Sequence, residues 1–86
     1  MKNYVYKTSG VCSREIHIDI DEQGVIANVR YVGGCSGNTQ GVSALVKDMS
    51  VDEAIKRLSG IKCGMKNTSC PDQLAVALTR IKENSI

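Results

Sequence analysis

The sequence predicts an α+β domain in which a three-stranded antiparallel sheet is followed by three helices packed on one of its faces. Two observations predict this class: apolar residues alternate with a period of two before residue 33, and they take helical spacing after residue 41. Because strand patterns come first and helix patterns follow, without repeats or linkers, the helices are expected to cover one face of the sheet. The 86 residues are predicted to form a single domain, 1–86.

The predicted strands cover residues 3–7, 14–21 and 25–32. The second strand has one apolar and one polar face, formed by Ile16, Ile18 and Ile20 against Glu15, His17 and Asp19. A turn ending in Gly24, which suits a left-handed backbone position, connects it to the third strand in a hairpin. The third strand is expected to present alternate residues on one face: Val25, Ala27, Val29 and Tyr31. His17 is interpreted as an exposed cross-strand residue, not as a ligand.

Three helices are predicted from apolar stripes and capping signals. The stripes consist of Val42, Leu45, Val46 and Met49 in the first, Val51, Ile55 and Leu58 in the second, and Leu74, Ala77, Leu78 and Ile81 in the third. Ser50 and Glu53 form a capping box for the second helix, supported by a Met49–Ala54 staple, and Gly60 ends it. Ser69 caps the third helix, with Asp72 three residues later and Pro71 tolerated in the first turn.

Composition excludes several classes of function. The balance of 11 basic and 9 acidic residues gives a net charge of +2 without a basic run, so nucleic-acid binding is not expected. The N-terminal segment lacks the apolar core of a signal peptide, and no apolar run could span a membrane, so a cytoplasmic location is expected. A single His and a solvated set of carboxylates disfavour hydrolase chemistry. In a reducing compartment, cysteines favour metal or redox chemistry over structural disulfides.

The four cysteines lie in predicted loops or at element boundaries, outside the periodic core stripes: Cys12, Cys35, Cys63 and Cys70. Cys35 and Cys70 stand where helices begin, and free backbone amides there favour the thiolate form. Tight C-x-x-C pairs, which are typical of zinc ribbons, are absent from the sequence. Three interpretations remain open: a shared metal or cluster site, a redox-active thiol set, and inert cysteines.

The glycine-rich segment GGCSGN, residues 33–38, lacks the features of a P-loop or a dinucleotide-binding fingerprint. We interpret its glycines, together with Gly41, as allowing close backbone approach around Cys35. A nucleotide or flavin site remains an alternative, although the sequence offers no aromatic platform for one.

The word TSCPD, residues 68–72, together with GGCSGN upstream, resembles the small TSCPD-domain family, whose members are similar to the C-terminal region of adenosylcobalamin-dependent ribonucleotide reductases. The resemblance covers nearly the whole chain and implies a single TSCPD-like domain over residues 1–86. It also implies a cysteine-rich accessory to deoxyribonucleotide synthesis, with a ribonucleotide reductase or another protein as partner. The chain is too short for a reductase barrel, so catalysis by this chain alone is not implied.

A second resemblance is to iron–sulfur cluster assembly scaffolds. Residues 10–38 are similar to their first-cysteine loop, hairpin and second-cysteine loop, residues 49–58 to their capped connecting helix, and residues 69–78 to the start of their final helix. It implies a scaffold-like fold in which Cys12, Cys35 and Cys70 take the three cysteine-ligand places. The sequence departs from this pattern after the first cysteine, where Ser13 and Arg14 replace an acidic residue, and at Ser69, which replaces a histidine.

Cys63 can add a fourth thiolate to the three cysteines that the scaffold resemblance aligns, which would complete a closed tetrahedral site. Zinc is therefore the expected metal, with an iron–sulfur cluster as the alternative. The rival hypothesis is a thiol–disulfide relay that serves a ribonucleotide reductase, with Cys35 and Cys70 as its pair. The exposed sheet edges and one wet face also favour a homodimer.

Overall fold

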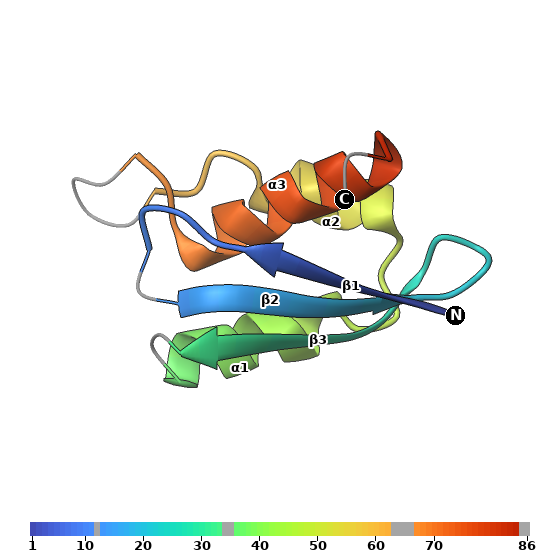
Figure 1. Ribbon diagram of the computed structural model, residues 1–86, viewed down its shortest axis with the longest axis horizontal. Helices are drawn as coiled ribbons and strands as arrows, with labels where there is room; N and C mark the ends of the chain where they lie inside the picture. Colours follow the sequence, from blue (N-terminus) through green and yellow to red (C-terminus); the bar gives the residue numbers. More distant parts are fainter. Residues whose placement is uncertain (12, 34–35, 63–66, 85–86) are drawn as a thin grey trace.

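The computed structural model describes residues 1–11, 13–33, 36–62 and 67–84, the side chains at positions 36 and 38 excepted. Three strands come first: β1 (Lys2–Lys7), β2 (Ser13–Ile20) and β3 (Ile26–Gly33). Three helices follow: α1 (Ser36–Val46), α2 (Val51–Leu58) and α3 (Cys70–Lys82). The strands form one antiparallel sheet in the order β1-β2-β3 (Figure 1). The predicted α+β class and the order of its elements are confirmed.

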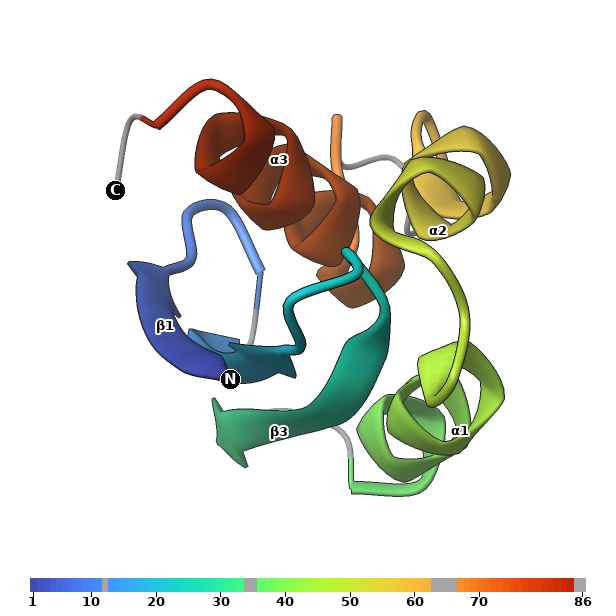
Figure 2. The same cartoon turned by 90° about the vertical axis from the view of Figure 1, so that its right-hand side faces the viewer.

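The core lies between the sheet and the helices. Seen from one end, the strands curve, α3 lies over the concave side, and α1 lies beside β3 with α2 between the two other helices (Figure 2). The sheet contributes Tyr6, Ile16, Ile18, Ile20, Ile26 and Val29, and the helices contribute Val42, Val46, Val51, Ala54, Leu74, Ala77 and Leu78. The core is therefore almost entirely aliphatic, as the absence of Phe and Trp requires.

The predicted two faces of β2 are confirmed. Ile16 and Ile18 are fully buried, whereas His17 on the opposite face is only half-buried and lies 3.0 Å from the carboxylate of Glu15. On that outer face, His17 stands between Val5 of β1 and Arg30 of β3. Its position agrees with the interpretation of a cross-strand residue.

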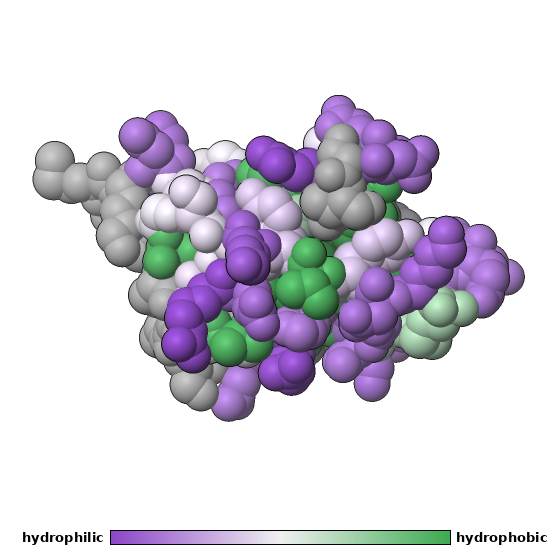
Figure 3. Space-filling view, viewed as in Figure 1, coloured by the Kyte–Doolittle hydropathy of each residue, from purple (hydrophilic) through white to green (hydrophobic). Residues whose placement is uncertain are grey.

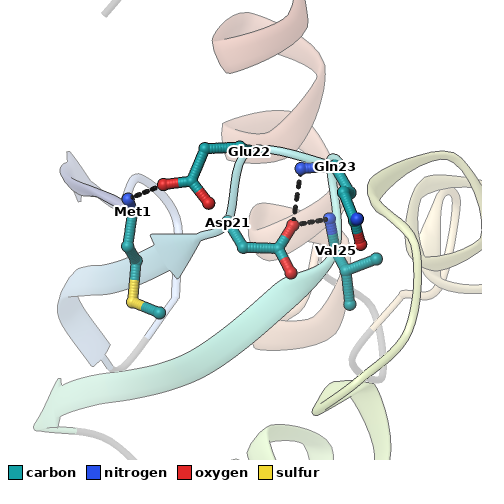
Figure 4. Close-up of polar contacts among 5 residues, drawn as sticks. All are labelled: Met1, Asp21, Glu22, Gln23 and Val25. Carbon is teal, nitrogen blue, oxygen red and sulfur yellow. Dashed lines mark hydrogen bonds and ion pairs between the residues drawn. The ribbon is translucent and has the colours of Figure 1, made fainter.

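The turn between β2 and β3 is organised by Asp21 (Figure 4). Its carboxylate accepts hydrogen bonds from the backbone N–H groups of Gln23, at 2.9 Å, and Val25, at 3.0 Å. Gly24 has a φ of +78°, the left-handed conformation that its position in the sequence predicts. The carboxylate of the neighbouring Glu22 pairs with the amino group of Met1, which ties the start of β1 to this turn.

The predicted face of β3 is wrong in its first half. Ile26 is fully buried, whereas Val25 and Ala27 are only partly buried. The register explains the difference: Asp19 pairs with Asn28 but Ile20 pairs with Ile26, so Ala27 is an extra residue at a β-bulge. A bulge shifts the alternation of faces by one residue, and a strict period of two cannot anticipate it.

Helix α1 differs from its prediction at two positions. Its buried stripe is narrow, with Val42 and Val46 facing the core, while the predicted core residue Leu45 is 76% exposed. Gly41 is also exposed, and a Cβ built on it meets nothing within 4 Å, so close packing does not explain this glycine. Met49 lies beyond the helix end and packs against the core from the connection to α2, where its carbonyl accepts from Ile26 N–H.

The predicted N-cap residues of the other two helices are confirmed, but the Glu53 carboxylate accepts from Arg57 at 2.7 Å, and no reciprocal capping-box bond to Ser50 is seen in the described part of the chain. The side chain of Ser50 accepts from Glu53 N–H at 3.1 Å, and that of Ser69 accepts from Asp72 N–H at 3.2 Å. Gly60, just beyond α2, has a φ of +84°.

On the face seen in Figure 3, hydrophilic side chains predominate and hydrophobic ones occur as small separate patches.

Candidate functional site

The site is built around Cys70, the first residue of α3. Its side chain is buried, with its sulfur 3.3 Å from the hydroxyl oxygen of Ser13, which is itself only 3% exposed. The hydroxyl of Tyr31 donates to the carbonyl oxygen of Cys70 at 2.9 Å. Burial, and then the nearby charge of Cys70, raise the pKa of Tyr31, so the phenol keeps the proton that it donates. Cys70 is therefore held from β2 and from β3.

Asp72 and Ser69 connect the start of α3 to the segment that leads to residue 63. The Asp72 carboxylate accepts from Gly60 N–H at 2.7 Å and from the hydroxyl of Thr68 at 2.5 Å. The hydroxyl of Ser69 donates to the carbonyl of Ile61 at 2.6 Å, in addition to capping the helix. These bonds keep residues 60 and 61 next to the first turn of α3.

Gln73 connects the same turn to the loop between β1 and β2. Its side-chain oxygen accepts from Ser9 N–H at 3.0 Å, and its amide nitrogen donates to the hydroxyl of Thr68 at 3.1 Å. Both polar ends of this buried side chain are therefore used. Gly10 approaches so closely that a Cβ there would lie 3.3 Å from a methyl carbon of Thr68, and its φ of +74° also favours glycine.

The sheet register places the ends of two further segments together. Ser13, at the start of β2, pairs with Gly33 at the end of β3. The start of α3, the β1–β2 connection and the end of β3 thus lie at one end of the molecule (Figure 1). Each of the four cysteines is either Cys70 itself or stands within two residues, along the sequence, of Ser13, Gly33 or Ile61.

Of the four predicted metal ligands, Cys70 lies in the described part of the chain, and Cys12, Cys35 and Cys63 lie outside it. Within residues 1–11, 13–33, 36–62 and 67–84, no three His, Cys, Asp or Glu side chains are grouped so that they could hold a metal ion. The four-cysteine site therefore stays a prediction.

Sequence reasoning missed three residues that surround Cys70: Ser13, Tyr31 and Gln73. In the sequence, Ser13 stands out only as a departure from the scaffold pattern, and Tyr31 only as part of an apolar strand face. A weak signal existed for Gln73, since it is a polar residue directly before the buried stripe of α3. Their contacts join residues 39 to 64 positions apart, which local patterns do not reveal.

A surface pocket of about 460 Å³ lies beside this end, between β3 and α1. It is lined by Val29, Arg30, Tyr31, Gly33, Thr39, Gln40 and Ser43. Its size falls within the range of small-molecule sites. The predicted alternative of a nucleotide or flavin site is not tested by this observation.

The fold and site define a small α+β domain whose final helix begins with a buried cysteine, tied by polar side chains to the loops around it. The chain matches the TSCPD domain over residues 2–82, nearly its whole length, and belongs to that family. The family membership supports a small domain related to the C-terminal region of ribonucleotide reductases. No curated protein and no solved structure matches the chain. Likeness to iron–sulfur scaffolds is not shown by these comparisons.

In the part of the chain that the structure describes, no helix is both long and apolar enough to cross a bilayer.

Proposed function

We propose that this protein is a small metal-binding accessory module that holds zinc through Cys12, Cys35, Cys63 and Cys70. One observation carries the proposal: the described segments next to all four cysteines gather at one end of the molecule, around the buried sulfur of Cys70. Cysteines that are far apart in sequence can share one ion only if the fold brings their flanking segments together in this way.

The physical benefit of a metal fits this part of the molecule. An aliphatic core in a chain of 86 residues supplies limited stability. A tetrahedral zinc ion bound by four thiolates would connect these loops to α3, and the free energy of binding would add to the folding free energy. Four thiolates would bind an iron–sulfur cluster equally well, so the cluster is the alternative occupant.

A thiol–disulfide relay is less well supported. Rapid exchange needs an accessible thiolate, whereas the Cys70 side chain is buried and its residue is only 6% exposed. The kinship with ribonucleotide reductases makes a reductase, or another protein of deoxyribonucleotide synthesis, the proposed partner. That partner class implies a cytoplasmic location.

The test is alkylation of the native protein, purified without oxygen, with and without a strong chelator. Mass spectrometry counts the modified cysteines over time. The proposal predicts four slow thiols that become reactive together when the chelator removes zinc. Two fast thiols in metal-free protein would instead support the relay, and four equally slow thiols in metal-free protein would leave only inert cysteines.

A further inference from the structure

Ser13, at the start of β2, is a buried polar residue beside the first turn of α3. Its hydroxyl oxygen lies 3.3 Å from the sulfur of Cys70, and the residue is almost completely removed from solvent. The backbone around it is fixed, because Ser13 pairs with Gly33 across the sheet and its carbonyl accepts from the hydroxyl of Thr8. The hydroxyl is thus held against the sulfur by the sheet and by the β1–β2 loop.

The direction of this hydrogen bond follows from the chemistry of a metal site. A cysteine that binds a metal has lost its proton, so its sulfur can only accept. Ser13 must then donate its hydroxyl proton to the sulfur. Hydrogen bonds to a ligand orient it and change its electron donation to the metal. The hydroxyl would draw electron density from the metal–sulfur bond and fix the side-chain rotamer of Cys70.

We propose that Ser13 is a positioning residue for the metal site: its hydroxyl donates to the Cys70 sulfur, orients it and tunes its bond to the metal. This inference rests on the proposed function, since it needs a metal at Cys70. It goes beyond the four ligands, because it assigns a residue that does not itself bind the ion.

The experiment uses the full chain loaded with Co²⁺, whose sulfur-to-cobalt charge-transfer absorption reports on the thiolates. Ser13→Ala is expected to shift this band to lower energy, because a thiolate without its hydrogen bond gives up an electron more easily. It is also expected to weaken Co²⁺ binding by about tenfold, the lower end of the effect of losing such a partner.

Tyr31→Phe is the matched control. It removes a hydroxyl that is bonded to the carbonyl of Cys70, not to its sulfur. It should lower the free energy of unfolding and leave the band energy unchanged. A second pair controls for shape, because Thr and Val are isosteric with each other: Ser13→Thr keeps a hydroxyl and should retain the wild-type band, whereas Ser13→Val should show the shift. This pair also covers the case in which Ser13→Ala does not fold.

The outcomes distinguish a failure of the proposed role of Ser13 from a failure of the proposed metal site. If the wild-type protein binds no Co²⁺ with thiolate absorption, the proposed function fails and the role of Ser13 fails with it. If the wild type binds Co²⁺ and the variants without the hydroxyl keep its band energy and affinity, the role of Ser13 is refuted while the metal site stands. An equal band shift in Tyr31→Phe would also refute it, because the effect would then reflect packing around Cys70.

Discussion

The first turn of α3 and the turns that follow it are stabilised in different ways. In the later turns Leu74, Ala77 and Leu78 are fully buried among aliphatic side chains of the sheet and of α2. Around the first turn, Thr68, Ser69, Asp72 and Gln73 form hydrogen bonds to two loops and to one another. Burial of apolar area is non-directional, whereas these hydrogen bonds fix where particular backbone atoms lie.

The comparison shows where a small domain places its stability and where it places specific geometry. The later turns of α3 supply stability through buried area. The first turn contributes less stability, but it determines which loops meet at the end where the cysteines are predicted to converge. Substitutions in the two parts should therefore differ both in size and in what they affect.

The largest effect is expected from Leu78→Ala in the apolar part. The Leu78 side chain is fully buried in the core, so its truncation should lower the free energy of unfolding by about 3 kcal/mol. Leu45→Ala is the matched control, because Leu45 is 76% exposed, and its cost should stay within about 0.5 kcal/mol. Urea denaturation measures both. Equal losses would contradict the assignment of the core.

Asp72→Ala should have the next largest effect, at the polar end. Loss of its hydrogen bonds to Gly60 N–H and to the Thr68 hydroxyl is expected to cost about 2 kcal/mol. Asp52→Ala is the control, since Asp52 is an exposed carboxylate that pairs with Lys82 at the surface. If the site is as proposed, the Asp72 variant also loses zinc at lower chelator concentration. Equal stability of the two variants would argue against the importance of the first turn.

Ser69→Ala and Ser50→Ala compare the two helix caps. Ser69 is buried and both caps α3 and donates to Ile61, so its loss should cost about 1.5 kcal/mol. Ser50 is exposed and caps α2 with a single side-chain bond, so its loss should cost about 0.7 kcal/mol. Thermal unfolding distinguishes them, and a larger effect at Ser50 would reverse the expected ranking.

The smallest effect concerns the outer face of the sheet, away from both parts of α3. A hydrogen bond from His17, aided by the charges of His17, Lys7 and Arg14, lowers the pKa of Glu15 below its ordinary 4.5. A lowered carboxyl pKa stabilises the fold above pH 4.5, and this contribution is lost as the pH falls through the folded-state pKa.

Titration of Glu15 by carbon-13 NMR tests this pair. In His17→Ala the pKa of Glu15 should rise toward 4.5, whereas that of Glu22, which the Met1 amino group lowers, should not change. An unchanged pKa of Glu15 would show that His17 does not interact with it in solution.

The part of the fold that sequence could predict is the part with regular periodicity. Ile16, Ile18 and Ile20 revealed β2, and Leu74, Ala77 and Leu78 revealed α3, because burial on one face repeats with the geometry of each element. Prediction failed at Ile26, where the bulge adds a residue, and at Leu45, where the buried stripe of α1 is narrower than its apolar residues suggest. The spacing of apolar residues along the sequence shows neither an inserted residue in a strand nor a helix face that is only partly covered.

In the described part of the chain, the candidate site was predictable only at Cys70 and at its helix cap. Cys70 and Ser69 stand out locally, because the cap and the proline mark the start of a helix. Ser13, Tyr31 and Gln73 act through contacts between distant segments, and such contacts depend on the register of the sheet and the placement of α3. Only the assembled fold brings them to Cys70.

The central claim is that the four cysteines, whose described neighbouring segments meet at this end, bind one metal centre. The most direct measurement is elemental analysis, with a visible spectrum, of tag-free protein purified without oxygen. The account predicts close to one zinc per chain and no visible absorption, with iron and charge-transfer absorption identifying a cluster instead. Metal far below one equivalent per chain, in protein whose cysteines are all reduced, would contradict it.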